Sequence, residues 1–353
     1  MPHPHDSARR PFVTALIAAR DAAPFIARAL CSLARQAVDD LEILVVDDGS
    51  SDGTGAEVER CARLDRRIRL LTLARNRGQA AALNAGLPEA RGRYLALLDA
   101  DDEATPGRLA LQLAALEADP GLVAVGGAVA PWCDRHGLEG PIWRYATDDA
   151  DIRARSLFKS EVISGALTVD LEVLRRHRIR FDETLRVGAD WTLSLDLLRV
   201  GRLANVRPVV LRYRIHPGQL TAGMMDDLGS DSTRIRRRAL SWIGLAPSDG
   251  ELRTHLAVSP CAYWPFGAHP FFRAGRATLA ADARRWFAKL REAAGRGGPF
   301  PAGALDAYLD EIEGLIEETL ARTGGAPGPL PCPAASPLSC VSDRPCRVAV
   351  SAR

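Results

Sequence analysis

The sequence predicts an α/β protein with a mostly parallel central sheet flanked by helices and a helical C-terminal extension. Two observations predict this class. Over residues 12–129, short apolar runs alternate with helix-length segments, and strands that are apolar on both faces are typical of parallel sheets covered on both sides. After residue 231, the spacing of apolar residues becomes helical.

The predicted strands are short apolar runs. They fall at 12–19, 41–46, 68–73, 94–98, 122–129 and 204–215, with a further apolar run at 162–169. Parallel sheets bind ligands at the carboxyl ends of their strands, so the residues that follow each run are the first candidates for a functional site.

The predicted helices lie between these runs and in the last third of the chain. They span 24–37, 57–64, 79–87, 105–116, 171–177, 190–200, 234–243, 276–294 and 304–320. The last helix has Leu305, Leu309 and Ile316 on one face and acidic residues on the other, so it needs an apolar partner.

Composition narrows the classes of function. The chain has 353 residues, with 46 basic and 44 acidic side chains and a formal charge of +2, so no nucleic-acid partner is expected. Its seven cysteines do not form a disulfide scaffold, and those at 332, 340 and 346 lack the paired spacing of a zinc site.

No apolar run reaches the ~18–20 residues of a membrane span, and the N-terminus has no signal-peptide pattern. We therefore expect a cytoplasmic protein, with peripheral contact at the inner face of the membrane left open.

Acidic residues follow two of the predicted strands. Asp47 and Asp48 precede a turn of Gly, Ser and Asp, while Asp99, Asp101 and Asp102 follow the strand at 94–98. A helix-capping turn and a solvated acidic loop are the structural interpretations. Clustered carboxylates also suit a hard cation such as Mg²⁺ or Mn²⁺, which joins one or two of them to substrate phosphates. Because both acidic segments follow parallel strands, the functional interpretation is a site for a metal-bridged nucleoside diphosphate.

Four motifs then carry a resemblance to a known family. They are Ile17–Asp21 with Pro24–Ile26, Glu42–Thr54, Arg75–Gln79 with Asn84–Gly86, and Leu98–Asp102 with Pro106. Over residues 11–220 the chain resembles the family 2 glycosyltransferases of the GT-A fold. The resemblance implies a metal-dependent hexosyltransferase-type enzyme that uses a nucleoside diphosphate sugar, with a UDP-sugar favoured.

The resemblance also implies a domain organisation. A GT-A domain would occupy 11–228, with a nucleotide-binding half at 11–130 and an acceptor-side half at 131–228. A flexible N-terminus at 1–10, a helical region at 229–323 and a disordered tail at 324–353 complete the expected organisation, since the tail is rich in Pro, Gly, Ser and Ala.

Donor-binding residues are implied at the strand ends. Asp48 and the backbone of Ala18 would hold the base, and Arg20-Asp21 replaces the common Tyr-Asn, where a guanidinium can stack on a base. Asp99 and Asp101 match the DXD motif, with Asp99 toward the ribose and Asp101 on Mn²⁺ or Mg²⁺. The other implied donor contacts are Asn76, Gly78 and Ala100.

Downstream residues supply the catalytic expectations. The family often has Glu-Asp where this chain has Ala189-Asp190, and Asp190 matches the catalytic base, although a lone Asp before a helix also suits an N-cap. Trp191 is either a contact for the acceptor sugar or a core residue. His216, in a segment similar to the family's Tyr-Arg-x-His, is either a metal ligand or structural.

The implied reaction is a single displacement with inversion at the anomeric carbon. Asp190 would take the proton of an acceptor hydroxyl on a glycan, a lipid-linked or another acceptor. A catalytically weak nucleotide-sugar-binding pseudoenzyme is the alternative. A dinucleotide-dependent oxidoreductase and a sugar-nucleotide pyrophosphorylase both need glycines between Ile17 and Pro24, where there are none.

A basic run lies in the predicted helix at 234–243. It comprises Arg234, Arg236, Arg237 and Arg238, and suits either a solvated helix face or contact with lipid phosphate or an anionic acceptor.

Overall fold

The computed structural model describes residues 12–133, 137–216, 218–219, 230–259, 276–296 and 301–323. The predictions of a flexible N-terminus at 1–10 and a disordered tail at 324–353 concern residues outside the described ones. The elements of the first part are β1 (Val13–Ala19), α1 (Ile26–Ala34), β2 (Leu41–Asp47), α2 (Thr54–Leu64), β3 (Ile68–Thr72), α3 (Gln79–Gly86), β4 (Tyr94–Leu97), β5 (Glu103–Ala104), α4 (Arg108–Ala118) and β6 (Leu122–Cys133).

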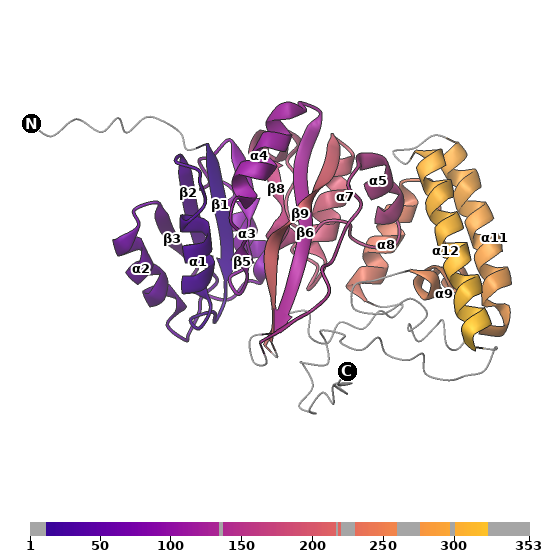
Figure 1. Cartoon of the computed structure of the whole chain (residues 1–353), viewed down its shortest axis with the longest axis horizontal. Coiled ribbons are helices and arrows are strands. Elements are labelled where there is room, and N and C mark those ends of the chain that lie inside the picture. The colour runs from indigo at the N-terminus through magenta and orange to yellow at the C-terminus, as the bar shows by residue number, and fades with distance from the viewer. Residues whose placement is uncertain are drawn as a thin grey trace, which may run out of the picture. The chain divides into compact units, whose positions relative to one another are not determined.

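The second part is more helical, as the sequence predicts (Figure 1). Its elements are β7 (Leu138–Glu139), α5 (Asp149–Ser156), η1 (Ser164–Ala166), β8 (Thr168–Asp170), α6 (Leu171–His177), α7 (Ala189–Leu198), β9 (Arg202–Ile215), α8 (Asp231–Ser241), α9 (Asp249–Val258), α11 (Arg276–Gly295) and α12 (Ala302–Thr323). Helix α9 was not predicted, although its Ser248–Glu251 capping box is a recognisable start signal.

The sheet confirms the predicted α/β class. Its strand order is β3-β2-β1-β4-β8-β6-β9-β5, with β7 paired to the end of β6. Strands β3, β2, β1 and β4 are mutually parallel, whereas β8 is antiparallel to both β4 and β6. The apolar run predicted at 162–169 contains the short 3-10 helix η1 and leads into β8, a three-residue antiparallel strand. The carboxyl ends of β1, β2 and β4 consequently lie at one edge of the sheet.

Helices cover both faces of the parallel strands. A Cβ placed on Gly86 of α3 would meet Leu16 and Val46, while one on Gly55 of α2 would approach Leu70. Leu70 pairs with Val45, the sequence neighbour of Val46, and successive side chains of a strand point to opposite faces. Helices α2 and α3 therefore pack on opposite faces, which explains why these strands are apolar on both sides.

The chain forms two compact units. The first comprises the described residues up to Val129, together with Val162–Thr184 and Val200–Tyr213. The second comprises the described parts of Ala130–Glu161, Leu185–Arg199 and Arg214 onward. Each unit is therefore built from segments that are separated in the sequence, and the domain boundaries expected above stay a prediction.

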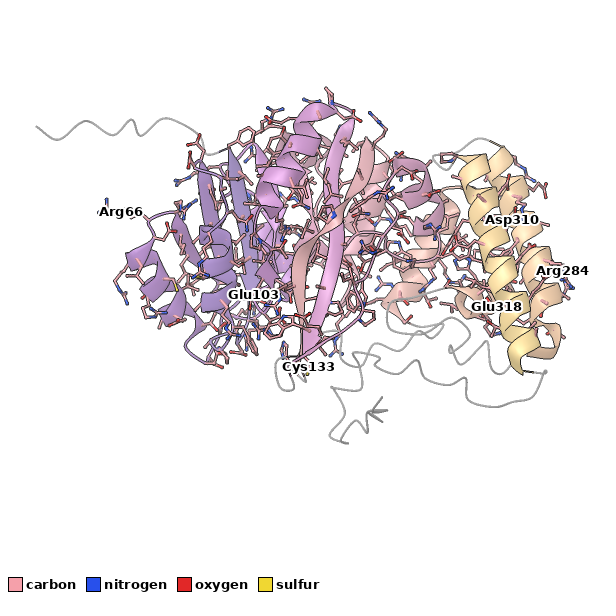
Figure 2. The ribbon with its side chains drawn as sticks, in the orientation of Figure 1. Arg66, Glu103, Cys133, Arg284, Asp310 and Glu318 are labelled. Atoms are coloured by element: carbon pink, nitrogen blue, oxygen red, sulfur yellow. The ribbon has the colours of Figure 1, made fainter. Side chains whose placement is uncertain are left out.

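The core of the second unit includes the predicted partner of the last helix. Leu305, Leu309 and Ile316 of α12 are buried with Trp286 and Phe287 of α11, and the two helices lie side by side in Figure 1. The acidic residues of α12 stay at the surface, among them Asp310 and Glu318 (Figure 2). The amphipathic pattern thus buries an apolar stripe against a neighbouring helix.

A buried histidine connects three segments of this core. The Nε1–H of Trp286 donates to Nδ1 of His255 at 3.0 Å, and Nε2 of His255 lies 3.0 Å from the carbonyl oxygen of Leu157. The ring stacks on Phe158 with 4.4 Å between centroids. Burial, reinforced by the charge of Arg236, lowers the pKa of His255 to about 3. The imidazole is therefore neutral at neutral pH and donates from Nε2 to Leu157.

Gly92 provides a test of strand packing before β4. A Cβ on this residue would lie 2.5 Å from the backbone nitrogen of Thr14 and 2.7 Å from the carbonyl oxygen of Tyr94. Because backbone atoms cannot move aside, Gly92→Ala should lower the free energy of unfolding by about 1–3 kcal/mol. Gly314→Ala, in α12 with nothing within 4 Å of the new Cβ, should be neutral or stabilising by up to ~1 kcal/mol. Equal denaturant midpoints for the two variants would contradict the packing argument.

Candidate functional site

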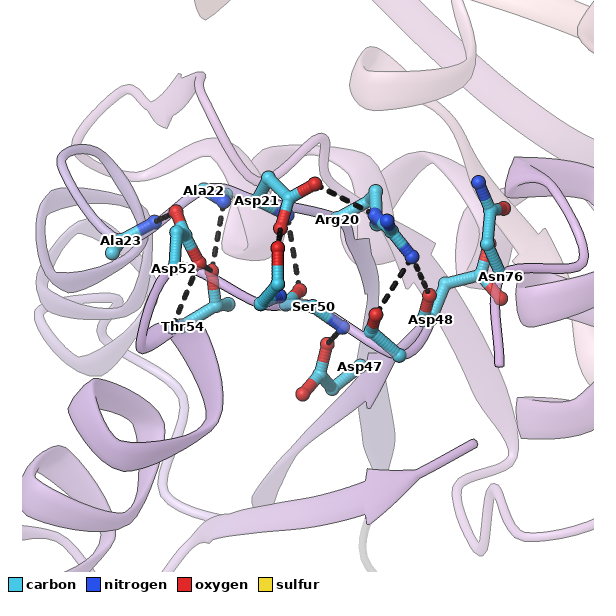
Figure 3. A network of polar contacts seen from close by, with 12 residues as sticks. Arg20, Asp21, Ala22, Ala23, Asp47, Asp48, Ser50, Asp52, Thr54 and Asn76 are labelled. Carbon is cyan, nitrogen blue, oxygen red and sulfur yellow. Dashed lines mark hydrogen bonds and ion pairs between the residues drawn. The ribbon is translucent and has the colours of Figure 1, made fainter. Parts of the chain in front are cut away.

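The loops after β1 and β2 are tied together by polar contacts (Figure 3). Arg20 donates from Nη1 to the carbonyl oxygens of Asp48 at 2.9 Å and Gly49 at 2.7 Å, and from Nε to Asp21 at 2.8 Å. The backbone N–H of Ser51 and the guanidinium of Arg20 hold the pKa of Asp21 below its usual value. Arg20 and Asp21 thus belong to the loop framework itself, and stacking of Arg20 on a base stays a prediction.

Asp48 is buried at the end of β2, with 2% of the residue exposed. Its Oδ1 accepts the N–H of Arg77 and its Oδ2 accepts the N–H of Gly78, both at 2.8 Å. Gly78 shares its N–H with Oδ1 of Asn76 at 2.9 Å. The structure thus brings Asp48, Asn76 and Gly78 together, and each carboxylate oxygen retains acceptor capacity.

Gly49 allows this arrangement. It has a φ of +65°, and a Cβ would lie 2.8 Å from the carbonyl carbon of Arg75. Only glycine fits this left-handed turn against a neighbouring backbone without strain. The turn after β2 therefore lies directly on the loop that leads into α3.

The acidic turn after β4 meets the same helix. Nε2 of Gln79, the first residue of α3, donates to Oδ1 of Asp99 at 2.9 Å. Since Gly78 binds Asp48, the start of α3 contacts both acidic strand ends. In the turn after β4, Asp99 and Asp101 are half-buried and Ala100 is buried. Ala18, near the end of β1, is also half-buried. Asp48 and Asp99 thus both contact the start of α3, while their joint role in binding stays a prediction.

A buried arginine lies behind the acidic turn. Arg108 donates from Nη1 to the carbonyl oxygen of Gly165 at 2.6 Å, from Nη2 to that of Leu97 at 2.8 Å, and from Nε to Gln112 at 3.1 Å. Burial lowers the pKa of Arg108 to about 10, and the carboxylates of Asp102 and Asp99 oppose that shift. The guanidinium is therefore charged at neutral pH and offsets part of the negative charge of the turn.

The donor set of this turn fits a hard divalent cation. Among the described residues, no group of three or more His, Cys, Asp or Glu side chains forms a complete metal site. Mg²⁺ does not need one, because it is commonly held by one or two carboxylates together with substrate phosphates and water. Asp99 and Asp101 offer oxygen ligands of that kind, so the fit rests on their chemistry rather than on a closed cage.

Asp190 belongs to the second unit. It lies in the first turn of α7, after Gly188 with a φ of +79°, and its Oδ1 accepts the N–H of Trp191 at 2.8 Å. The residue is half-buried. Gly188 is the N-cap residue of α7, so the N-cap interpretation of Asp190 is wrong, while the catalytic interpretation stays a prediction.

Trp191 lies in the core of the second unit. It is 5% exposed, and its Nε1–H donates to the carbonyl oxygen of Ser156 at 3.0 Å. The guanidinium carbon of Arg236 lies 4.9 Å from the ring centroid. These contacts are those expected of a core residue. A contact between Trp191 and the acceptor sugar stays a prediction.

His216 and the basic run also lie in the second unit. His216 is half-buried, and its backbone N–H donates to Gln219 at 2.9 Å, while its role as a metal ligand stays a prediction. The arginines of the run have partners, either within α8 or on other segments. Arg234 pairs with Asp231, Arg236 donates to the carbonyl oxygen of Phe158, Arg237 pairs with Asp249 and Arg238 pairs with Asp196. These contacts leave little unpaired charge in this run.

Sequence reasoning missed Gln79, Gly165 and Arg108. A Cβ on Gly165 would lie 3.0 Å from Oδ2 of Asp99, so this turn contacts the acidic segment from a distant part of the chain. The position of Arg108, two residues after Pro106 at a helix start, gave a local signal only for the helix. Its burial depends on Gly165, which no local pattern indicates.

Comparison with known proteins decides the family. The model for "Glycosyl transferase family 2" matches residues 14–160. The succinoglycan biosynthesis protein ExoO of Rhizobium meliloti (strain 1021) is 36% identical over 250 residues, covering 67% of this chain and 71% of that protein. The chain belongs to glycosyltransferase family 2. This confirms the resemblance seen in the four motifs.

Two further comparisons agree with this assignment. An uncharacterized glycosyltransferase of Haemophilus influenzae is 28% identical over 239 residues, covering 66% of this chain and 74% of that protein. Among solved structures, S. aureus TarS 1-349 in complex with UDP-GlcNAc has a TM-score of 0.53 at 16% identity, covering 88% of this chain and 92% of that one. This likeness confirms the GT-A-like fold with its C-terminal helices. No helix in the described part of the family 2 chain is both long and apolar enough to span a membrane.

Proposed function

We propose that this family 2 glycosyltransferase transfers a sugar from a nucleoside diphosphate sugar, with a UDP-sugar favoured, to an acceptor hydroxyl in polysaccharide, glycan or glycolipid synthesis. The observation that carries the proposal is the start of α3, which contacts Asp48 through Gly78 and Asp99 through Gln79. Two acidic strand ends at one edge of a parallel sheet suit a base and a diphosphate bound side by side. The names of ExoO and of a second relative, ExoU, both succinoglycan biosynthesis proteins, support polysaccharide synthesis.

Each donor-binding residue has a proposed role. Asp48 accepts an N–H of the base. Ala18, Arg20 and Asp21 lie next to the base. Asn76 and Gly78 contribute from the loop that leads into α3. Asp99 binds the ribose with Ala100 beside it, and Asp101, with Asp99, would hold Mn²⁺ or Mg²⁺. When bound, such an ion neutralises charge that develops on the diphosphate. The UDP-GlcNAc bound by TarS, which shares the fold, supports a UDP-sugar.

The proposed reaction is a direct displacement. Asp190 accepts the proton of the acceptor hydroxyl as its oxygen forms a bond to C1 of the sugar. The bond between C1 and the phosphate oxygen breaks, and its electron pair leaves with the nucleoside diphosphate. Attack from the face opposite the leaving group inverts C1 and needs no covalent intermediate with the protein.

A panel of nucleotide sugars tests the proposal. The purified chain is incubated with UDP-, GDP- and dTDP-sugars and Mn²⁺, Mg²⁺ or EDTA, and released nucleoside diphosphate is measured. We expect release from at least one donor, abolished by EDTA and by Asp101→Asn, because that carboxylate is the proposed metal ligand. Glu103→Gln in the same acidic segment is the matched control, since Glu103 pairs with Arg212 at 3.6 Å, and should retain release.

Donor binding is measured separately, as the increase in thermal unfolding temperature that each nucleotide sugar causes. Binding without release from any donor would favour the pseudoenzyme alternative. Neither binding nor release across the panel would refute the nucleotide-sugar site.

A further inference from the structure

A cluster of exposed basic residues lies on the first unit, outside the proposed site. It is called the arginine patch here and consists of Arg91, Arg93, Arg175, Arg176, His177, Arg178 and Arg180. Two segments supply it, one just before β4 and the other at the end of α6 and beyond. The sequence pattern does not indicate this cluster, because its two segments are far apart along the chain.

The two segments form one continuous surface. The N–H of Leu171 donates to the carbonyl oxygen of Arg93 at 3.0 Å, and Nη2 of Arg175 donates to that of Ala90 at 2.6 Å. Backbone pairing of Tyr94 with Asp170 places the start of α6 beside the start of β4. The arginines of both segments are therefore neighbours despite about eighty intervening residues.

Acidic neighbours neutralise only part of the patch. Glu172 pairs with Arg175 at 2.7 Å, and Glu42 lies 3.8 Å from Arg91 while it also pairs with Arg69. The Asp170 carboxylate accepts backbone N–H groups at the start of α6, and Glu89 pairs with Arg69. In the part of the chain that the structure describes, the remaining arginines of the patch make no ion pair. They are Arg93, Arg176, Arg178 and Arg180.

The position of the patch separates it from the donor site. Arg93 precedes β4, whereas Asp99 follows it, so the two lie at opposite edges of the sheet. The patch can therefore be occupied while the acidic strand ends stay accessible. This arrangement suits attachment of the protein to a surface better than binding of its small substrates.

We propose that the arginine patch binds the anionic lipid headgroups of a membrane. Clustered guanidinium groups attract an anionic bilayer and form paired hydrogen bonds with phosphate. Lipids diffuse laterally, so they adjust to irregularly spaced arginines without a preformed pocket. Bases of nucleic acid would need exposed aromatic rings to stack on, and the aromatic residue between the segments, Tyr94, is 1% exposed.

Co-sedimentation of the full chain with vesicles tests this assignment. The vesicles contain phosphatidylcholine alone, or with about one third phosphatidylglycerol, which gives an anionic surface. We expect binding only to the anionic vesicles, weakened by salt because the attraction is electrostatic. Arg176→Glu with Arg180→Glu should weaken it at least about tenfold.

Arg63→Glu with Arg66→Glu is the matched control. Both residues are exposed arginines of the first unit away from the patch, and Figure 2 labels Arg66. This variant has the same net charge and should bind vesicles nearly as the parent does. An equal loss in both variants, or equal binding to neutral vesicles, would overturn the proposal. Tighter binding to a soluble acidic polysaccharide than to vesicles would overturn it too, in favour of a polymer partner.

The proposal does not depend on the sugar-transfer proposal. Release of nucleoside diphosphate from a soluble donor, without vesicles, should be unchanged in Arg176→Glu with Arg180→Glu. Should these charge reversals lower the unfolding midpoint, the pair Arg176→Gln with Arg180→Gln gives the same comparison at half the charge change. Unchanged vesicle binding in that folded variant would refute the role of the patch.

Discussion

Asp190→Asn should lower sugar transfer by about 10²–10⁴-fold and leave donor affinity unchanged. The amide is the same size as the carboxylate. Its oxygen can still accept the N–H of Trp191, which lies 2.8 Å from Oδ1 in the wild-type protein. The start of α7 is therefore preserved. What the amide cannot do is take a proton from the acceptor hydroxyl, so the loss should fall on turnover.

Asp196→Asn is the control for this prediction. Asp196 lies on the same helix and pairs with the guanidinium of Arg238, a half-exposed contact whose loss should cost at most ~1 kcal/mol of stability. Turnover is measured with saturating donor, and donor affinity is measured separately by calorimetry. Wild-type turnover in Asp190→Asn would exclude Asp190 as the base, and a loss of donor affinity instead would make it a binding residue.

Arg108→Met should lower the free energy of unfolding by about 2–5 kcal/mol. The methionine fills much of the volume but leaves the carbonyl oxygens of Gly165 and Leu97 without their donor. It also removes the positive charge that faces Asp99 and Asp102. Two backbone segments, at Leu97 and Gly165, are therefore held by this one side chain, which is 1% exposed.

Denaturant unfolding compares this variant with Arg66→Met, which removes an exposed arginine and should change stability by less than ~0.5 kcal/mol. Arg108→Lys should be intermediate, because an ammonium keeps the charge but cannot reproduce the planar fork that reaches separate acceptors. Equal stability of Arg108→Met and Arg66→Met would show that the buried contacts contribute nothing net.

The parallel half of the fold could be predicted because each strand is a local apolar run. The same rule placed Asp48 and Asp99 at one edge, since parallel strands end together. The antiparallel direction of β8 could not be predicted, because it depends on which strands flank a three-residue segment. Local patterns identify elements; pairing between distant segments is decided by tertiary contacts.

Burial of polar residues was the least predictable property. Arg236 and Arg238 belong to one basic run, yet Arg236 is 2% exposed and donates to Phe158, while Arg238 pairs with a distant helix. The arginine patch shows the reverse case, in which two unremarkable segments meet at the surface. In both cases the decisive neighbours are tens of residues away along the chain.

The core around Trp191 has a consequence for biosynthesis. Its inner layer joins Phe158 and Trp191 to Phe287 and Leu309, which are translated roughly a hundred residues later. At ~5–20 residues per second, the earlier aromatics wait on the order of ten seconds for their final neighbours. A nascent polypeptide arrested before α11 therefore lacks Phe287 and Leu309, so this core is incomplete until both helices have been synthesised.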